Sequence, residues 1–430
     1  MAIRTGVDLE LLLARARKVI PKGTSSTNRA PWKEVIVRAQ GPYVWDSDGK
    51  QYVDYLLAWG PIVLGHCDPR VNEAAARAAT NCDLTAVGPQ VGEVELAEAI
   101  CRTMPSADRV AFCTSGTEAT MHAVQVARAA TGRSKLLKFH GSYHGWQDAL
   151  AVGSRSAAGP ATALGLDQPD AGGLHPAALS DTIVCDWNDI EGVRSVFAEF
   201  GASLAAVVCE PYVHSYGCVA PSDGFLEELR AMCTEHGAAL IFDEVKTAFR
   251  AHLGGYQVLC EVTPDLTAFA KAIANGYPLS GIAGKAALMD SIGVEGGAAF
   301  AGTYNAAPFA IAAGLATFDA LQGGAIERIW ELGGRMREGL AAIIKERSVP
   351  AAVVGMGSEW IIYFRQSPPR NYREALEGDM DLARRYQLGM MEQGVLEPIF
   401  PTGDRRLCAA TAEEDVDRTL EAADRVLGSL

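Results

Sequence analysis

One lysine, Lys271, interrupts an otherwise apolar stretch at positions 264–281, which reads PDLTAFAKAIANGYPLSG. Lysine is seldom buried without a partner, and loss of hydration lowers its pKa toward the range in which the neutral amine is a nucleophile. Such an amine attacks carbonyl carbons and forms Schiff bases. The sequence therefore predicts that Lys271 is a covalent anchor for a carbonyl compound.

A second candidate, Asp243, ends the apolar run AALIF. Ligands of open parallel sheets bind beyond the carboxyl ends of the strands, so a carboxylate at this position is well placed to hold a positively charged group. The alternative is a helix cap or a surface charge. Another lysine, Lys246, comes three residues after Asp243 and is expected not to reach the same carbonyl carbon as Lys271.

A turn rich in hydroxyls occurs in CTSGTEATMHA, where Ser115, Gly116 and Thr117 lie between a predicted strand and a predicted helix. Backbone N–H groups and the helix dipole converge there on an anion, which suits a phosphate. The stretch matches neither GxxxxGK[ST] nor GxGxxG, so it predicts neither a Walker loop nor a dinucleotide site. The alternative is that the hydroxyl only caps the helix.

Aromatic side chains occupy a loop in KFHGSYHGW, where Tyr143 and His144 lie between Gly141 and Gly145. Rings on such a loop can stack on a planar ligand, or they can be ordinary core or surface aromatics. His140 is four residues before His144, but the glycine between them argues against a helix that presents both to a metal ion. No metal site is predicted.

Together these parts match the needs of pyridoxal 5'-phosphate. That cofactor requires a lysine for the Schiff base, an acid for the pyridinium nitrogen, an anion site for the phosphate and a ring that stacks on it. Each part alone has an ordinary structural alternative, but the set predicts a pyridoxal phosphate site.

The elements that must position these residues follow from hydrophobic periodicity. An amphipathic helix is expected over 8–19, and the next strands carry turn signals that indicate an antiparallel meander. From about position 61 short apolar strands alternate with helices, which predicts a mostly parallel sheet. Long helices and a few strands follow beyond 306. The predicted fold class is α/β, with an N-terminal segment of the small domain at 1–61, a large cofactor-binding domain at 62–305 and a smaller α+β domain at 306–430.

The composition excludes several classes of partner. The 430 residues carry 38 Lys and Arg against 52 Asp and Glu, a net charge of -14, and no basic cluster offsets it, so neither nucleic acid nor a membrane surface is an expected partner. The ten cysteines form no CxxC pair and are expected to be reduced thiols, which favours a cytoplasmic location. The N-terminus lacks a signal-peptide pattern, and no apolar run of membrane-spanning length is expected.

The order and spacing of the motifs resemble the class III (subgroup II) aminotransferases of pyridoxal phosphate fold type I, and within them most closely the glutamate-1-semialdehyde 2,1-aminomutases. The resemblance covers nearly the whole chain, through GTSSTNRAP, FCTSGTEATMHAVQVARAATGRSK, FHGSYHG, VVCEPY, GAALIFDEVKTAFR and AGTYNAAP. It implies a homodimer with two active sites at the interface. It also implies small-molecule amino acid and oxo acid substrates.

The resemblance assigns roles to individual residues. Lys271 is expected to form the Schiff base and Asp243, which lies 28 positions earlier in the chain, to hold the pyridinium nitrogen. The remaining cofactor-binding set that it implies is Ser115, Gly116 and Thr117 on the phosphate, Thr303 from the other subunit, Tyr143 stacked on the ring, His144 beside it, Glu210 in support and Val245 packed against the ring.

Four residues are candidates for substrate binding. The resemblance implies that Ser26 and Arg29 bind a carboxylate and that Trp59 lines the pocket. Arg406, in a tandem with Arg405, could add a second guanidinium, and the alternative is a solvated surface pair.

The chain departs from the aminomutase pattern at two places. A C-terminal glutamate that helps steer the diamine intermediate is replaced by Pro401 or Gly403, and an expected asparagine is Ser215. We therefore expect an aminotransferase that moves an amino group between an α- or β-amino acid and an oxo acid. The alternatives are an aminomutase, a racemase of the same fold and a protein that binds pyridoxal phosphate without catalysis.

Overall fold

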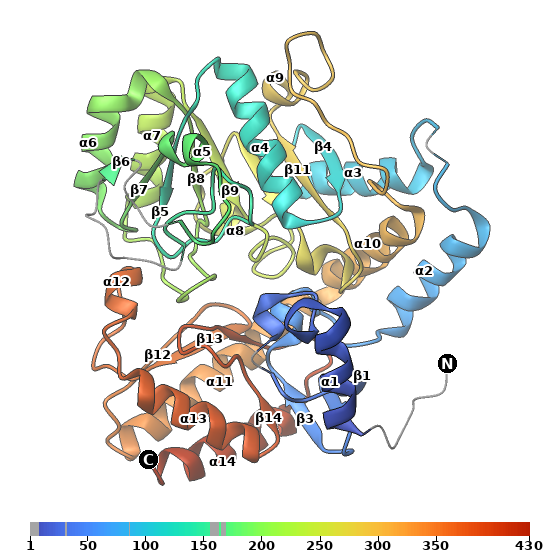
Figure 1. The fold of residues 1–430 in the computed structure, drawn as a ribbon, viewed down its shortest axis with the longest axis vertical. Coiled ribbons are helices and arrows are strands. Elements are labelled where there is room, and N and C mark those ends of the chain that lie inside the picture. The colour runs from blue at the N-terminus through green and yellow to red at the C-terminus, as the bar shows by residue number, and fades with distance from the viewer. Residues whose placement is uncertain (1–7, 31, 86, 155–162, 165–168) are drawn as a thin grey trace.

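The computed structural model describes residues 8–30, 32–85, 87–154, 163–164 and 169–430. The chain forms two lobes, a large one built on a central sheet and a smaller one that contains both ends of the described chain (Figure 1). The first helix, α1 (Leu9–Val19), begins after Asp8, whose carboxylate accepts a hydrogen bond from the Leu11 amide at 3.0 Å. This cap confirms the predicted helix over 8–19.

An eight-stranded sheet forms the centre of the large lobe. Its spatial order is β4 (Arg109–Cys113), β11 (Ser280–Gly284), β10 (Leu266–Phe269), β9 (Ala239–Asp243), β8 (Leu204–Cys209), β5 (Lys135–Phe139), β7 (Thr182–Cys185) and β6 (Ala163–Leu164). The five strands from β10 to β7 pair in parallel, while β11 and β6 are antiparallel to their neighbours. The predicted mostly parallel sheet is confirmed.

Helices cover both faces of this sheet, because its strands are buried on both sides and need two apolar layers. One layer packs α6 (Ile190–Phe200) and α7 (Phe225–His236) on the sheet, and the other packs α4 (Gly116–Thr131). The other helices of this lobe are α2 (Pro69–Asn81), α3 (Val91–Thr103), α5 (Pro176–Ser180), α8 (Tyr256–Leu259) and α9 (Ala286–Met289).

The small lobe joins the two ends of the chain. The predicted meander is present as β1 (Ile36–Gln40), β2 (Tyr43–Asp46) and β3 (Gln51–Asp54), and β14 (Val395–Leu396) extends this sheet in parallel to β3. A second sheet has the order β12 (Ala352–Val354), β13 (Glu359–Tyr363) and β15 (Arg405–Arg406). The helices of this lobe are α11 (Ile326–Glu346), α12 (Tyr372–Ala375), α13 (Met380–Glu392) and α14 (Glu413–Leu427).

Helix α10 (Pro308–Ala320) packs on the large lobe, although it was expected to belong to the small domain. Its apolar residues share a core with α2 and α3 of the large lobe, although position 306 was the expected start of the small domain. The π-helical segment Leu321–Ala325 then connects α10 to α11. The division at 61/62 and 305/306 stays a prediction. The packing places the change of core within α11, because Ile326 and Ile329 belong to the core of the large lobe and Leu332 belongs to that of the small lobe.

The stretch 308–346, which runs from α10 through α11, is long and apolar enough to cross a membrane by length and composition alone, because it contains an 18-residue window with a mean hydropathy of 1.3. The expectation that no such stretch exists was wrong by this measure. The physical reason is that α10 is a core helix, with Ala310, Ile311 and Phe318 buried in the large lobe. An apolar core helix passes the same test as a membrane span.

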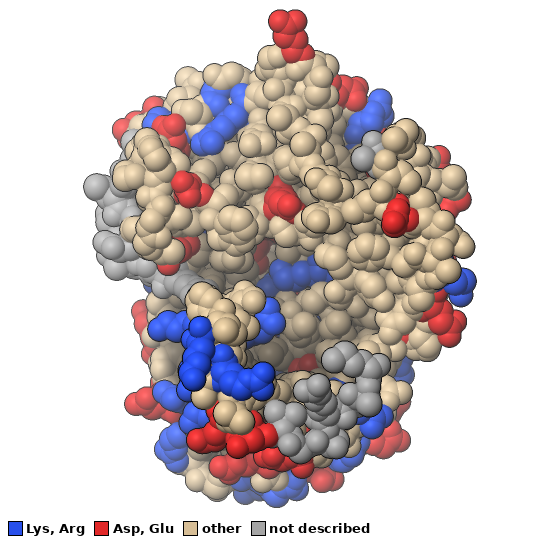
Figure 2. Space-filling model, turned by 45° about the vertical axis from the view of Figure 1, so that its right-hand side comes forward, with Lys and Arg blue, Asp and Glu red and all other residues tan. Residues whose placement is uncertain are grey.

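The candidate residues gather where the sheet meets the small lobe. Cys113 and Asp243 end β4 and β9, and Lys271 comes two residues after the end of β10. Figure 2 shows a hollow between the two lobes with Lys or Arg atoms at its floor.

Candidate active site

Lys271 projects into a cavity of about 260 Å³ at the ends of the strands. Its backbone lies in the left-handed region, with φ of 50°, a conformation that strains a residue other than glycine. Burial, reinforced by the positive charge of Lys246, lowers the pKa of Lys271 to about 8. Among the described residues no acceptor takes a hydrogen bond from its amine. The amine is therefore poised to act as a neutral nucleophile.

The turn that carries Trp59 lies over Lys271. Gly60 has φ of 115°, and a Cβ built there would lie 3.3 Å from Cδ of Lys271. A side chain at this position would be strained and would crowd the lysine. The glycine thus lets the small lobe close onto the lysine stem.

Asp243 and His144 form a buried pair at the end of β9. Oδ2 of Asp243 lies 2.7 Å from Nδ1 of His144, and its Oδ1 accepts a hydrogen bond from the Val245 amide at 3.0 Å. The carbonyl of His144 accepts a 2.7 Å hydrogen bond from Thr120, which fixes the loop on α4. Nε2 of His144 is buried with no partner among the described residues. These contacts orient the carboxylate at the cavity floor.

The predicted phosphate cup is the N-terminus of α4. Ser115 does cap this helix, since its hydroxyl accepts from the Glu118 amide at 3.3 Å and the Glu118 carboxylate accepts from the Ser115 amide at 2.7 Å. The amides of Gly116 and Thr117 come next and have no acceptor among the described residues. The helix cap is therefore present, and it leaves the amides of Gly116 and Thr117 for an anion, so the phosphate role of this turn stays a prediction.

Glycine is required where the aromatic loop touches this cup. Gly145 has φ of 89°, and a Cβ there would lie 2.5 Å from Oγ1 of Thr117. The close approach sets the loop of Tyr143 and His144 directly against the first turn of α4.

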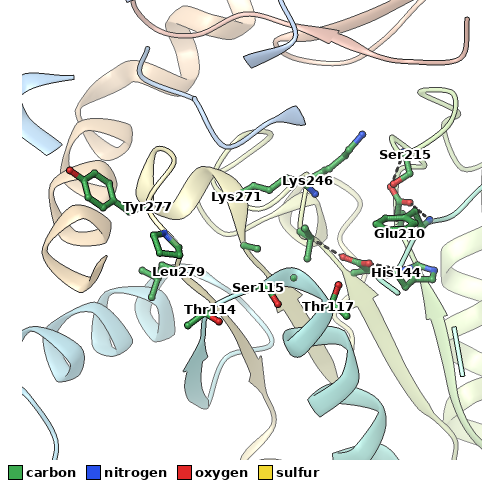
Figure 3. A pocket seen from close by; sticks show the side chains of 17 residues that line it. Thr114, Ser115, Thr117, His144, Glu210, Ser215, Lys246, Lys271, Tyr277 and Leu279 are labelled. Carbon is green, nitrogen blue, oxygen red and sulfur yellow. Dashed lines mark hydrogen bonds and ion pairs between the residues drawn. The ribbon is translucent and has the colours of Figure 1, made fainter. Parts of the chain in front are cut away.

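Glu210 holds two loops at the mouth of the cavity. Its Oε1 accepts from the Tyr143 amide at 3.0 Å, and its Oε2 accepts from the amides of His214 and Ser215 at 3.1 Å each. Tyr143 lines the cavity and is 38% exposed. The structure thus brings Lys271, the Asp243 pair, the cup, Val245, Tyr143 and Glu210 around one cavity (Figure 3).

A second cavity of about 300 Å³ adjoins the first. Tyr143, Ser215, Lys246 and Lys271 line both cavities. The rest of its lining is Asn28, Trp59, Tyr216, Tyr372, Leu376, Met380, Phe400, Pro401 and Thr402. Apart from Trp59, and Pro401 at the place of the expected glutamate, this set was not predicted, because it comes from distant segments and carries no motif that links them.

Two predicted substrate residues and one predicted cofactor residue take positions that the sequence did not reveal. Ser26 and Arg29 line a different, larger cavity, which shares Trp59 with the cavity beside Lys271. Thr303 is exposed and does not line the cavity of its own chain. The roles of all three in binding stay predictions.

Arg406 is buried and does not line either cavity at Lys271, and neither is it part of a solvated pair. It donates to the carbonyl of Leu56 at 2.7 Å and to Glu359 at 3.3 Å, and it forms an ion pair with Asp404. Arg405 is buried as well and pairs with a carboxylate at 2.9 Å. The alternative that the two arginines form a solvated surface pair was therefore wrong. The guanidinium of Arg406 is engaged within the protein, so these contacts do not support its predicted role in substrate binding.

Asp404 is the centre of a buried ion-pair cluster, which we define as His214, Glu359, Asp404, Arg406 and Lys246. His214 lies 2.9 Å from Glu359, and Lys246 donates to Asp404 at 3.0 Å. The positive charge of Arg406 holds the pKa of Asp404 well below its usual range. The cluster is therefore a set of mutually neutralised charges behind the active-site cavity.

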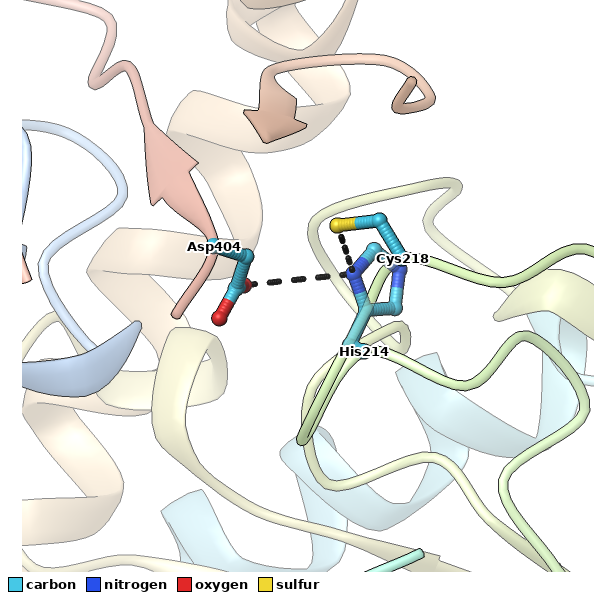
Figure 4. Close-up of side chains that lie close together, drawn as sticks. All are labelled: His214, Cys218 and Asp404. Carbon is cyan, nitrogen blue, oxygen red and sulfur yellow. Dashed lines mark hydrogen bonds and ion pairs between the residues drawn. The ribbon is translucent and has the colours of Figure 1, made fainter. Parts of the chain in front are cut away.

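Metal-ligating atoms also meet in this cluster. His214, Cys218 and Asp404 place one such atom each within 4.8 Å of one another (Figure 4). Two cations already pair with Asp404, and burial raises the pKa of Cys218 well above its usual value, so neither is free to act as an anionic ligand. These three side chains are better explained as part of the ion-pair cluster than as a metal site.

The cavity fits pyridoxal 5'-phosphate on the chemistry of its side chains. A neutral amine, an oriented carboxylate, two unpaired amides at a helix N-terminus and an aromatic loop surround one space. Each matches one functional group of that cofactor.

Known proteins agree with this chemistry. Residues 24–407 match the family model described as aminotransferase class-III. A glutamate-1-semialdehyde 2,1-aminomutase of Nitrosospira multiformis is 38% identical over 96% of this chain and 98% of its own length.

Solved structures agree as well. An omega-transaminase from Sphaerobacter thermophilus superposes with a TM-score of 0.92 at 33% identity, covering 98% of this chain and 97% of its own. A glutamate-1-semialdehyde-aminomutase from Pseudomonas aeruginosa in complex with PMP gives 0.87 at 26% identity, covering 98% and 94%. The chain therefore belongs to the class III aminotransferase family and is an enzyme of fold type I that depends on pyridoxal 5'-phosphate.

Proposed function

We propose that the enzyme is an aminotransferase, which takes an amino group from an external amino acid and delivers it to an external oxo acid in two half-reactions. The observation that carries this proposal is the lining of the second cavity, where none of the described side chains is acidic. The segment that was expected to supply a steering glutamate supplies Phe400, Pro401 and Thr402 instead. Without a carboxylate to retain a second amine, an aminated product leaves more readily.

The chain's own residues account for both half-reactions. Pyridoxal phosphate, when bound, takes up the electron pair left by the proton that departs from the substrate carbon. Lys271 would hold the cofactor covalently and, once displaced by substrate, would move that proton as a neutral amine. Asp243 would hold the protonated ring nitrogen, and the amides of Gly116 and Thr117 would hold the phosphate.

A homodimer in the cytoplasm is proposed with this function. The position of Thr303 supports the dimer, because this residue is exposed and does not line the cavity of its own chain. A partner subunit could therefore receive it, as the family resemblance implies.

The second candidate is a 2,1-aminomutase. The names of the curated relatives favour it over transamination, since the Nitrosospira multiformis protein and one from Nitrosomonas europaea, 37% identical over 97% of this chain, share that name. This candidate requires that the intermediate be retained without the missing glutamate.

One experiment separates the two candidates. The purified holoenzyme is given a panel of amino donors with 2-oxoglutarate or pyruvate, and separately glutamate-1-semialdehyde alone. Amino transfer between separate donor and acceptor, with slow formation of 5-aminolevulinate, supports the aminotransferase. Efficient 5-aminolevulinate formation with no bimolecular transfer across the panel would establish the aminomutase instead.

A further inference from the structure

Lys246 lies at the junction of the two cavities that meet at Lys271. It comes three residues after Asp243 and lines both the cofactor cavity and the apolar cavity. Figure 3 shows the side chains of Lys246 and Lys271 next to each other. The positive charge of Lys246 also contributes to the lowered pKa of Lys271, which agrees with their proximity.

The ammonium group of Lys246 is held in place before any ligand binds. Nζ donates to Oδ1 of Asp404 at 3.0 Å and to the carbonyl of His214 at 3.2 Å. An ammonium group has three N–H donors, and the third has no acceptor among the residues that the structure describes. A fixed ammonium with one open donor can bind an anion at a low entropic cost.

Lys246 is not the only cation that pairs with Asp404. The carboxylate of Asp404 is shared with Arg406, and Glu359 is paired with Arg406 and His214. The two acids of the ion-pair cluster therefore have Lys246, Arg406 and the ring of His214 as partners. The third N–H of Lys246 is left for an incoming carboxylate, which it can bind through a charge-assisted hydrogen bond.

The other walls of the second cavity are neutral. Lys246 and Lys271 are its only charged side chains among the described residues, and most of the rest are aromatic or aliphatic, including Trp59, Tyr372 and Phe400. Trp59 and Phe400 also contact each other, with ring centroids 5.9 Å apart. Such a surface suits an uncharged apolar group and has no partner for a second acid or for a basic tail.

We propose that Lys246 binds the carboxylate of the substrate, and that the cavity beside it selects amino acids with an aromatic or aliphatic side chain. The amino group then lies at Lys271, the carboxylate at Lys246 and the side chain against Trp59 and Phe400. Lys246 is thus a specificity residue, and Asp404 is a positioning residue that acts through it. This inference rests on the proposed function for its substrate class.

The kinetic test compares an acid with the amine that lacks its carboxylate. The pairs are phenylalanine with 2-phenylethylamine and 3-amino-3-phenylpropanoate with 1-phenylethylamine, each with the holoenzyme and its Lys246→Met, Lys246→Gln and Lys246→Arg variants. We expect the two neutral variants to raise KM for the acid that the enzyme accepts by about 10- to 100-fold, the loss of one charge-assisted hydrogen bond. The paired amine should change less than about 3-fold, and Lys246→Arg should retain part of the acid's affinity.

The matched control is Lys285→Met, which removes a lysine that pairs with Asp265 outside both cavities. It should leave KM for both members of each pair unchanged. An equal rise in KM for the acid and the amine in the Lys246 variants would overturn the proposal. A shift in the absorbance of the cofactor would also overturn it, because it would show that Lys246 contacts the cofactor. A selective loss in Arg29→Ala with none in Lys246→Met would overturn it as well.

A binding measurement keeps this inference separate from the proposed function. Calorimetric titration of the holoenzyme with 3-phenylpropionate, which has no amine to react, and with 3-phenylpropanol needs no turnover. We expect 3-phenylpropionate to bind more tightly and to lose that advantage in Lys246→Met. If 3-phenylpropionate binds as expected but the enzyme shows no amino transfer, the aminotransferase proposal fails and the role of Lys246 stands. If the enzyme transfers amino groups but binds both ligands equally, the role of Lys246 fails and the aminotransferase proposal stands.

Discussion

Two strand ends of the same sheet each carry a lysine that is withdrawn from solvent, Lys138 completely and Lys271 in part, and their surroundings differ. Lys138 lies in β5 with no exposed surface, and its Nζ donates to the carbonyls of Val152, Leu150 and Ser142 at 2.6, 2.9 and 3.1 Å. It also contacts the hydroxyl of Ser154 at 3.0 Å. Lys271, beyond β10, has no acceptor among the described residues.

The difference teaches how burial can produce either structure or chemistry. Acceptors around Lys138 replace the water it has lost, so its ammonium ties the loop of Tyr143 and His144 to the sheet. Lys271 lost water without replacement, and its pKa falls to about 8 as a result. The first lysine positions the aromatic loop, and the second is left free for the proposed reaction beside it.

The largest effect should come from Lys271→Ala. Turnover should fall at least about 10³-fold, because both the covalent anchor and the proton carrier are lost. The fold should persist, since no described residue depends on a hydrogen bond from this amine. Single-turnover rates and the thermal midpoint measure the two parts, and a variant that keeps more than a tenth of the activity would refute the assigned role.

Lys138→Met should have the opposite signature. It leaves three carbonyls and a hydroxyl short of a donor, so the free energy of unfolding should fall by about 2–4 kcal/mol. Lys135→Met, on the same strand, removes a more exposed pair with Asp181 at 3.4 Å and should cost less than about 1 kcal/mol. Urea unfolding of both variants checks the contrast, and equal losses would show that burial of Lys138 has no special value.

Asp243→Asn should separate chemistry from cofactor retention. Turnover should fall by about 10²-fold or more, because an amide cannot stabilise a protonated ring nitrogen. The Gly116 and Thr117 amides remain, so the cofactor should stay bound. Steady-state rates with a titration of pyridoxal phosphate test this, and near-normal turnover would remove Asp243 from the mechanism.

The smallest predicted effect concerns the pH dependence of the rate at which the enzyme takes up its cofactor. The neutral form of Lys271 captures the cofactor, so the rate of pyridoxal phosphate uptake by the cofactor-free enzyme should rise with pH and level off above about 8. An ordinary lysine would keep gaining rate to about pH 10.4. Stopped-flow absorbance between pH 6.5 and 10.5 measures the profile, and a rise that continues to the upper limit would contradict the lowered pKa.

Local patterns predicted most of the fold. Alternating apolar strands and helices gave the parallel sheet, and the turn signals gave the meander of β1, β2 and β3. The strand β11 was not predicted, because its sequence SGIAG has two glycines and no alternation of apolar and polar residues. The pairing of β14 with β3 joins positions more than 300 residues apart, and no local signal encodes it.

The site was predictable to the extent that its parts lie at strand ends. Asp243 ends a strand, and Ser115 and Lys271 each lie two residues beyond one, so topology alone brings them together. The burial of Arg406 could not be predicted from the sequence, because the pairing of β13 with β15 is what brings Glu359 close to Arg406 and Asp404. The assignment of Arg29 to a separate cavity depends on the path of the N-terminal segment, which no pattern in the sequence fixes.

The central claim is that the unpaired lysine, and not its neighbour, carries the cofactor. Borohydride reduction of the holoenzyme followed by peptide mapping fixes the cofactor to the lysine that holds it. We predict that the pyridoxyl mass appears on the peptide that contains Lys271 and is absent from the peptide that contains Lys246. A pyridoxyl group on Lys246, with Lys271 unmodified, would contradict the account.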